Sequence, residues 1–151
     1  MISTLKIIII NGPNLNMLGK REPEYYGNST LEVINDTCSK VGEANGVDID
    51  FKQSNDESEI IGWIQGVPED TGIIINAGAY THTSIAIHDA LKLSPSPAIE
   101  VHISNIYKRE EFRQKSYLSS AVDGLIVGFG ENSYVLAIEA MRKILIQKDK
   151  K

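Results

Sequence analysis

Short apolar runs alternate along the chain with longer segments of mixed polarity, and five runs of the first kind can be distinguished. Runs such as LKIIII at residues 5–10 and GIII at 72–75 are continuous and β-branched, which is typical of parallel strands that are covered on both faces. The segments between them carry apolar residues at helical spacing. Such an alternation of strands and helices predicts an α/β fold with a parallel sheet.

The same pattern gives approximate bounds for each element. The expected strands are Leu5–Ile10, Val47–Gln53, Gly72–Ile75, Ala98–His102 and Gly124–Val127, and the expected helices lie near 30–45, 57–66, 83–93, 109–118 and 132–147. The second strand begins VDIDF, and this strict alternation of apolar and acidic residues predicts an edge position. We therefore expect the strand order 2-1-3-4-5.

Length and composition favour one compact domain over residues 1–151, with a frayed polar tail from about residue 147. The net charge of −5 argues against nucleic acids and anionic membranes as partners. The first apolar run is too short for a signal peptide or a membrane span, so we expect a cytoplasmic protein. The single cysteine, Cys38, lies in a predicted helix and is expected to be a small buried residue with no chemical role.

Chemically active side chains gather directly after the predicted strands. The segments are NGPNLNMLGKREPEYYG at 11–27, NAGAYTHTS at 76–84, HISNIYKREEFRQ at 102–114 and GFGENS at 128–133. The carboxyl ends of parallel strands meet at one edge of an open sheet, where ligands bind. The first of these loops is much longer than most strand-to-helix connections, which is typical of a functional lid. The sequence thus predicts a site at this edge.

Four of these pieces, NGPNLNMLGKREPEYYG, INAGAYTHTS, IEVHISN and REEFR, resemble the signature segments of type II 3-dehydroquinate dehydratase, in the same order and across nearly the full length. The resemblance implies a flavodoxin-like three-layer α/β domain. It also implies an enzyme that removes water from 3-dehydroquinate to give 3-dehydroshikimate, with neither a metal nor an organic cofactor. Members of the family usually assemble as a dodecamer built from four trimers, so the resemblance implies a homo-oligomer.

The resemblance also implies a role for individual residues in the first loop. Tyr26 matches the family's catalytic base, which must take a proton from the carbon beside a ketone. A phenol is mostly protonated at neutral pH, so a cation must favour its ionised form, and Arg21 matches the arginine that does this. Asn14 matches the asparagine that holds a water on the enolate, and Asn76 matches one that positions the substrate. A turn or cap role is the alternative for either asparagine.

Loss of the hydroxyl group requires a general acid, and His102 matches it. Glu100 stands two residues earlier, on the same side of the strand, where it can orient the imidazole. By the same resemblance the substrate's carboxylate is bound by Ile103 and Ser104, and its hydroxyl groups by His82 and Arg113. Two more residues match positions near the substrate: Arg109 beside the site and Asp89, which reaches the site of a neighbouring subunit. An exposed helix with ion pairs is the alternative for the segment that holds both arginines.

Other functions on a similar fold fit the sequence less well. A phospho-acceptor receiver needs an aspartate after the third strand, where Asn76 stands. A flavin- or nucleotide-binding module, the main alternative, needs a phosphate cradle in the first loop, but Pro13, Leu15 and Leu18 occupy that loop. No lysine in a predicted pocket suggests a Schiff base, and no Cys/His pair has the spacing of a zinc site. The sequence does not distinguish aromatic biosynthesis from quinate breakdown.

Overall fold

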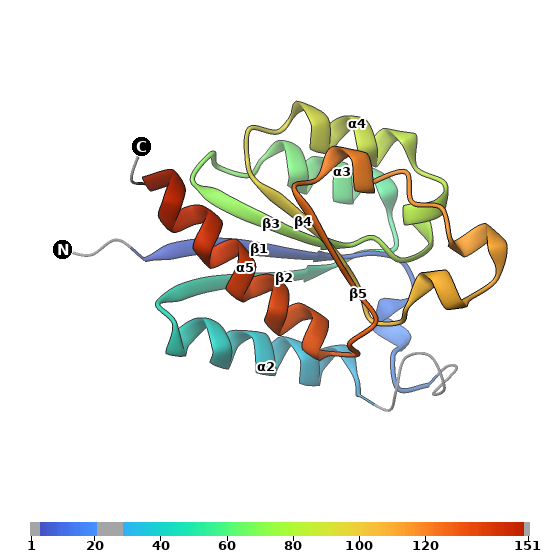
Figure 1. Cartoon of the computed structure of the whole chain (residues 1–151), viewed down its shortest axis with the longest axis horizontal. Coiled ribbons are helices and arrows are strands. Elements are labelled where there is room, and N and C mark those ends of the chain that lie inside the picture. Colours follow the sequence, from blue (N-terminus) through green and yellow to red (C-terminus); the bar gives the residue numbers. More distant parts are fainter. Residues whose placement is uncertain (1–3, 21–28, 150–151) are drawn as a thin grey trace.

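The computed structural model describes residues 4–20 and 29–149, and its centre is a sheet of five parallel strands (Figure 1). The sheet order is β2-β1-β3-β4-β5, and the strands are β1 Leu5–Asn11, β2 Val47–Gln53, β3 Thr71–Asn76, β4 Ala98–His102 and β5 Gly124–Val127. In register, Asn11 of β1 stands opposite both Gln53 of β2 and Asn76 of β3. Polar strand ends are thereby aligned at the carboxyl edge.

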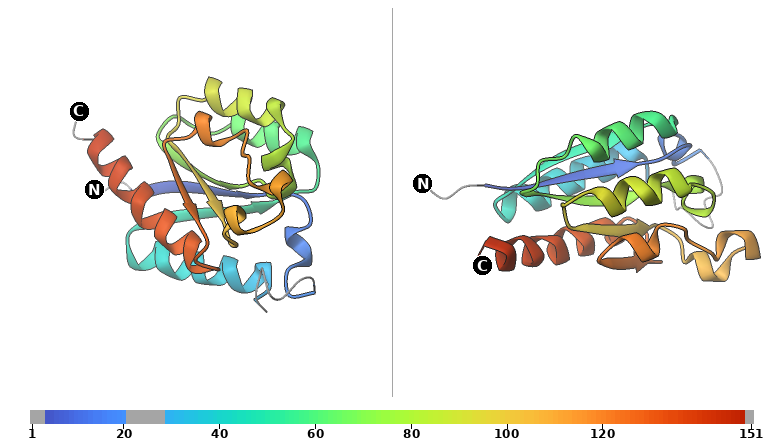
Figure 2. Two further views of the ribbon diagram at one scale, coloured as in Figure 1. Left: turned by 45° about the vertical axis from the view of Figure 1, so that its right-hand side comes forward. Right: turned by 90° about the horizontal axis from the view of Figure 1, so that it is seen from above.

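Helices cover both faces of the sheet (Figures 1 and 2). In the described residues the α-helices are α2 Leu31–Ala44, α3 Glu57–Gln65, α4 Ile85–Leu93 and α5 Asn132–Asp149. Successive residues of β1 point to opposite faces, so Ile7 and Ile9 join the core under α2 and α5 while Ile8 and Ile10 join the core under α3 and α4. Burial on both sides explains why the central strands are continuous runs of isoleucine.

Polar caps explain where three of the helices begin. The Oγ1 of Thr30 accepts a hydrogen bond from the N–H of Val33 at 3.2 Å, which caps α2. Asp56 caps α3 and Ser84 caps α4 in the same way, each through a side-chain oxygen. Each cap satisfies a backbone donor that the first turn of a helix leaves without a partner. Short 3-10 turns, η1 to η5, occupy several of the connecting loops.

The predicted fold class, sheet order and edge position of β2 are confirmed. The strand bounds agree with the prediction to within one residue, and α5 continues to Asp149, past the expected start of a frayed tail. Cys38 is buried in α2 as predicted, and burial, assisted by the negative charge of Glu131, raises the pKa of its thiol to about 12. Within the ranges 4–20 and 29–149, no helix has the length and apolar character required to cross a membrane.

The helix predicted over residues 109–118 is wrong. The structure has only a 3-10 turn there, η4 Glu111–Arg113, preceded by η3 Ile106–Lys108 and followed by η5 Ser119–Ala121. Backbone groups of this segment bond to distant partners instead, since the N–H of Tyr117 donates to the carbonyl of Thr81 at 2.9 Å. Serine side chains also compete for the local backbone. Tertiary contacts here override a helix-compatible pattern.

Candidate active site

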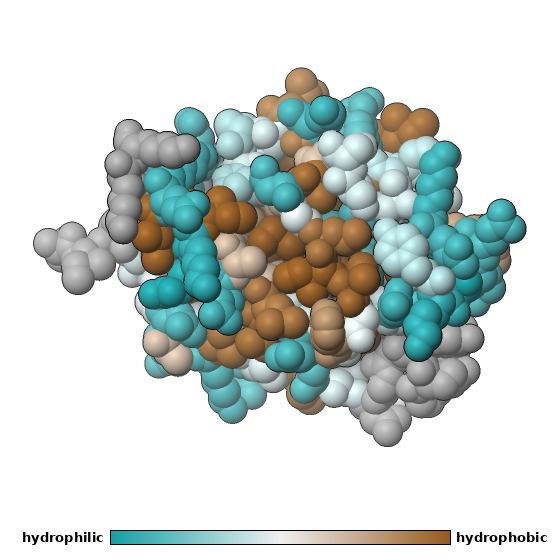
Figure 3. All heavy atoms as spheres, in the orientation of Figure 1, coloured by the Kyte–Doolittle hydropathy of each residue, from teal (hydrophilic) through white to brown (hydrophobic). Residues whose placement is uncertain are grey.

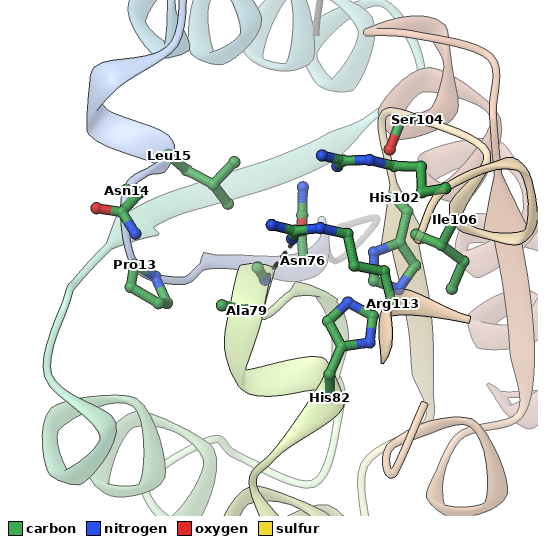
Figure 4. A pocket seen from close by; sticks show the side chains of 12 residues that line it. Pro13, Asn14, Leu15, Asn76, Ala79, His82, His102, Ser104, Ile106 and Arg113 are labelled. Atoms are coloured by element: carbon green, nitrogen blue, oxygen red, sulfur yellow. Dashed lines mark hydrogen bonds between the residues drawn. The ribbon is translucent and has the colours of Figure 1, made fainter. Parts of the chain in front are cut away.

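A cavity of about 120 Å³ opens at the carboxyl edge of the sheet, beside β1, where the strand order reverses (Figure 4). This is the position at which open α/β sheets bind ligands. Seven residues that the sequence predicted for the site line the cavity: Asn14, Asn76, His82, His102, Ser104, Arg109 and Arg113. The loops after β1, β3 and β4 therefore meet around one space.

Glycines allow the loops after β1 and β3 to touch. The N–H of Gly12 donates to the carbonyl of Asn76 at 2.8 Å, and a Cβ at residue 12 would lie 2.1 Å from the carbonyl oxygen of Ala77. Gly78 adopts a φ of +60°, a left-handed conformation that favours glycine. Asn14 also has a positive φ, of 69°, which asparagine tolerates better than most residues. The close approach brings Asn14 and Asn76 to the same cavity wall.

A buried neutral hydrogen-bond cluster holds Asn76. Its Nδ2 donates to the hydroxyl of Tyr134 at 2.9 Å, and its Oδ1 accepts from the N–H of Gly78 at 3.2 Å. The Tyr134 hydroxyl in turn donates to the Oδ1 of Asn11 at 2.6 Å. Tyr134 on α5 is completely buried, and burial raises the pKa of its phenol. The cluster fixes which end of the Asn76 amide faces the cavity, and it leaves one Nδ2–H outside the cluster.

A second buried cluster lies at the end of β4 and is charged. Glu100 and His102 point to the same side of the strand, and the Oε2 of Glu100 lies 2.5 Å from the Nε2 of His102. Ser116 donates to the same oxygen at 2.9 Å, while Ser119 donates to Oε1 at 2.7 Å. Glu100 is 0% exposed. Burial opposes its ionisation, but the bonds from His102, Ser119 and Ser116 outweigh burial and hold the pKa of the carboxyl below its usual value.

An ionised Glu100 determines the orientation of His102. A carboxylate only accepts hydrogen bonds, so the Nε2 of His102 carries a proton towards it. The other ring nitrogen, Nδ1, is then available to the cavity that His102 lines. Nδ1 is therefore the ring atom from which a proton could pass to a ligand in the cavity. The geometry is that of an acid held in place by its partner.

His82 lies next to His102 but is held differently (Figure 4). It comes from η2 Gly78–His82, and its ring stacks on that of His102 with centroids 6.5 Å apart. Its Nδ1 lies 2.8 Å from the carbonyl of Lys115 and donates to it, because a carbonyl only accepts. Burial lowers the pKa of His82, and the charge of His102 lowers it further. His82 is therefore suited to hydrogen bonding in its neutral form.

Two arginines supply positive charge to the cavity. Arg113 of η4 donates through Nε to the Oε2 of Glu110 at 2.6 Å and also lines the cavity. Arg109 is only 8% exposed and lines the same wall. Two guanidinium groups beside so small a cavity favour a compact anionic ligand. The segment is not an exposed helix, but the contact between Arg113 and Glu110 is an ion pair of the kind that this alternative expected.

Three of the predicted site residues that the structure describes do not line the cavity. Glu100 lies behind His102, and the side chain of Ile103 is buried, so only its backbone could serve a ligand. Asp89 is exposed on α4. Its position is compatible with contact to another molecule, and the cavity of its own chain does not include it. The other two predicted site residues, Arg21 and Tyr26, lie outside the described residues.

Comparison with known proteins agrees with this arrangement. The family model described as dehydroquinase class II matches residues 5–142. The chain belongs to this family. A 3-dehydroquinate dehydratase of Rhizobium johnstonii is 51% identical over 142 residues, covering 93% of this chain and 98% of the relative. One of Nitratiruptor is 55% identical over 141 residues, covering 93% of this chain and 90% of the relative.

Solved structures of class II dehydroquinases also match the fold. The type II dehydroquinase of Butyrivibrio crossotus has a TM-score of 0.88 and 44% identity, covering 93% of this chain and 99% of that one. The type II dehydroquinase of Propionibacterium acnes has a TM-score of 0.89 and 39% identity, covering 97% and 99%. The similarity spans the whole fold, including every loop that contributes to the cavity.

The sequence did not identify all the residues that organise this dehydroquinase site. Ser116 lies in the segment predicted as a helix and Ser119 lies just after it, and their hydroxyl groups bind Glu100. Asn11 and Tyr134 are separated by 123 positions along the chain yet share a hydrogen bond. One signal was present for Tyr134, because a phenol in the core-facing pattern of a helix needs a buried partner. Nothing in the residue types alone indicated the partners of the serines.

Proposed function

We propose that the chain dehydrates 3-dehydroquinate to 3-dehydroshikimate by trans elimination through an enolate, in the shikimate pathway or in quinate breakdown. One observation carries the mechanism: the cavity combines the buried Glu100–His102 pair with two guanidinium groups and two asparagines. A compact cavity with an acid on one wall and cations beside it suits a small carboxylate that must lose water.

Tyr26 is proposed as the base and Arg21 as the cation that favours its phenolate. The reaction begins when a proton leaves the carbon beside the ketone, because the hydroxyl group on the next carbon leaves only after negative charge has developed. A nearby guanidinium lowers the proton affinity of a phenol and so increases the fraction of phenolate at neutral pH. Both residues come from the loop that follows β1 and contributes Asn14 to the cavity wall.

Asn14 and Asn76 are proposed to act on the oxygen that gains charge. Asn14 would hold a water at the enolate oxygen, and Asn76 would position the substrate through the amide that Tyr134 and Gly78 orient. Donors that are already in place before the reaction lower the barrier most, because no reorganisation is needed when the charge appears. The contact between the β1 and β3 loops supports this arrangement.

His102 is proposed as the acid that protonates the leaving hydroxyl group from Nδ1, while Glu100 holds Nε2. The substrate's carboxylate would be bound by the backbone of Ile103 and by Ser104. Arg113 and His82 would contact the ring hydroxyl groups, and Arg109 would add charge beside them. The lining of the cavity supports these assignments except those of Glu100 and Ile103, and the contact of Glu100 with Nε2 supports the role of Glu100.

The proposal treats residues 1–151 as one catalytic domain that needs neither metal nor organic cofactor. Proton transfer groups alone balance the reaction, since one proton is removed, one is returned to the leaving hydroxyl group, and water departs. A flavin- or nucleotide-binding role is the alternative. It is disfavoured because the cavity lining includes Pro13 and Leu15 in place of a phosphate cradle.

The proposal includes assembly into a homo-oligomer, a dodecamer built from four trimers. Figure 3 shows apolar atoms gathered in the middle of the face that carries β5, and Leu125 and Phe129 are 38% and 62% exposed. An exposed apolar patch rimmed by polar residues is typical of a protein–protein interface. Asp89 on α4 would reach the cavity of a neighbouring subunit. Sedimentation velocity tests this, and a fully active monomer would contradict it.

No nucleic acid or membrane partner is proposed, and the place of action is proposed to be the cytoplasm. The net charge of −5 supports the first point, because an acidic chain is repelled by polyanions. Besides copies of itself, the expected partner is the small carboxylate substrate.

The direct test is to add 3-dehydroquinate to the purified chain and follow the conjugated enone by ultraviolet absorbance. Turnover should persist after treatment with a chelator, and after borohydride in the presence of substrate, because the mechanism uses neither a metal nor a Schiff base. Flavin and nucleotide binding are measured in parallel. Absence of turnover, or loss of activity under either treatment, would contradict the proposed function.

A further inference from the structure

Glu100 is held by two serines that do not line the cavity. Its two oxygens have different partners, since Oε1 accepts from Ser119 at 2.7 Å and Oε2 accepts from both Ser116 at 2.9 Å and His102 at 2.5 Å. The carboxylate can rotate about its terminal bond unless both oxygens are bound. With Oε1 bound to Ser119, the other oxygen is directed at the imidazole.

We propose that Ser119, assisted by Ser116, is a positioning residue for proton transfer by His102, and that it acts by holding Glu100 ionised and oriented. The inference rests on the proposed function of His102. Ser119 acts only through Glu100, because the cavity lining does not include it.

The energetic argument concerns a carboxylate that is 0% exposed. A buried carboxylate without donors takes up a proton, since burial penalises the charge strongly. One donor, His102, is itself a proton-transfer group and is less able to donate to Glu100 while its own protonation changes. The serine hydroxyl groups take no part in proton transfer. They can keep Glu100 ionised through the whole reaction, so the proton on Nε2 of His102 need not pass to Glu100.

The local fold places Ser119 with some precision. The Oγ of Ser116 accepts from the N–H groups of Leu118 and Ser119 at 3.0 and 3.1 Å, forming a tight turn. Leu118 is 0% exposed and packs in the core under α3 and α4, which anchors that turn. The turn puts the two hydroxyl groups on different oxygens of one carboxylate. This gives a reason for the irregular backbone where the pattern predicted a helix, because a helix over 109–118 would not form this turn.

The charged groups around Glu100 determine what a pH experiment reports. His102 lies on the same strand, and His82 of η2 interacts with Glu100 through its charge. Arg113 of η4 acts on His82. Ser116 and Ser119 do not titrate in the accessible range, so replacing them adds no titration of its own.

The test compares Ser119→Ala with Ser120→Ala, a neighbour that is exposed. Without its hydroxyl donor, Glu100 takes up a proton at higher pH. The acidic limb of the kcat/KM profile should therefore move upward by roughly half to one pH unit, and kcat at neutral pH should fall roughly 10-fold. Ser120→Ala should match the unmodified chain. Ser119→Thr keeps a hydroxyl donor and should restore the position of the limb.

A double-mutant cycle with Glu100→Gln decides whether the serine acts through the carboxylate. In the Glu100→Gln background, Ser119→Ala should cause no further loss of kcat. An unmoved acidic limb in Ser119→Ala would overturn the inference, as would an additive effect in the cycle, which indicates a purely structural role. Both outcomes presuppose that the unmodified chain turns over 3-dehydroquinate. An inactive unmodified chain would instead contradict the proposed function itself.

Discussion

Two buried polar clusters lie beneath the cavity, and they differ in charge. The neutral cluster joins Asn11, Asn76 and Tyr134 across β1, β3 and α5. The charged cluster joins Glu100 and His102 of β4 to two serines of the loop that follows. Both are almost closed to solvent, with Tyr134 and Glu100 each 0% exposed.

This difference in charge indicates that the two clusters affect different properties of the enzyme. Neutral groups keep their hydrogen bonds over a wide range of pH, so the first cluster can fix the geometry of an amide without taking part in proton transfer. The second cluster keeps a buried charge, which is costly unless donors surround it, and that charge orients the neighbouring imidazole through the bond to its Nε2. Changes to the charged cluster should therefore alter rate and pH dependence. Changes to the neutral cluster should alter binding and stability.

The largest effect should come from removing the acid. In His102→Ala the leaving hydroxyl group has no proton donor, so kcat should fall by about 10²–10⁴-fold while KM changes little. Steady-state assays by ultraviolet absorbance measure both constants, and circular dichroism checks that the variant is folded. His82→Ala is the matched control, because it removes the neighbouring ring and should mainly raise KM. A crippled His82→Ala beside a normal His102→Ala would reverse the assignment of the two histidines.

The proposed base, Tyr26, belongs to neither cluster. Replacing Tyr26 should give the next largest fall in kcat. Tyr26→Phe removes the only ionisable atom of that side chain, so kcat should fall by at least ~10²-fold while substrate still binds. Arg21→Ala should also reduce kcat and should move the basic limb to higher pH, because the phenolate loses a stabilising cation. Tyr25→Phe is the control and should be nearly silent. A crippled Tyr25→Phe would mean that the tyrosines were assigned in the wrong register.

The order of strands and most helix bounds could be predicted because they follow from local periodicity. A run such as Ile7–Ile10 has few options besides a strand covered on both faces, and the alternation in β2 identifies an edge. The candidate site could be predicted for a related reason. In a parallel sheet the residues after each strand converge, so reading the strand ends found seven of the residues that line the cavity.

What could not be predicted depends on contacts between distant segments. The hydrogen bond from Tyr134 to Asn11 joins α5 to β1, and no local pattern specifies such a partner. The segment around Ser116 has a composition that suits a helix, but its hydroxyl groups bind Glu100 and turn the backbone instead. The gain from satisfying a buried carboxylate exceeds the small preference of a short segment for helix.

Changes to the neutral cluster should have a smaller effect, which falls on stability and substrate binding. Tyr134→Phe keeps the ring but leaves Asn11 and Asn76 each without one hydrogen-bond partner, so the free energy of unfolding should fall by about 1–3 kcal/mol. The Asn76 amide can then reorient, so kcat/KM should fall roughly 10-fold, mainly through KM, with no change in the pH profile. Urea unfolding and steady-state kinetics measure these quantities. A shifted pH profile would contradict the proposed division between the clusters.

The smallest expected effect is the pH dependence of stability, in which the clusters should act at opposite ends of the scale. The pKa of Glu100 is lowered from 4.5, so its contribution to folding is present above that pH and is lost as the pH falls through the folded-state pKa. The pKa of Tyr134 is raised from 10.0 by burial, so its contribution is present below that pH and is lost as the pH rises above it. Each group can change the unfolding free energy by at most about 1.4 kcal/mol per pH unit.

A series of urea unfolding measurements at different pH values gives the slope of the unfolding free energy against pH. Glu100→Gln should flatten this slope at acidic pH and leave it unchanged at alkaline pH, while Tyr134→Phe should do the reverse. Cys38 retains part of the alkaline slope, because its buried thiol, with a pKa of about 12, must also ionise on unfolding. Equal slopes in both variants would mean that neither cluster carries the titration, whatever the absolute stabilities are.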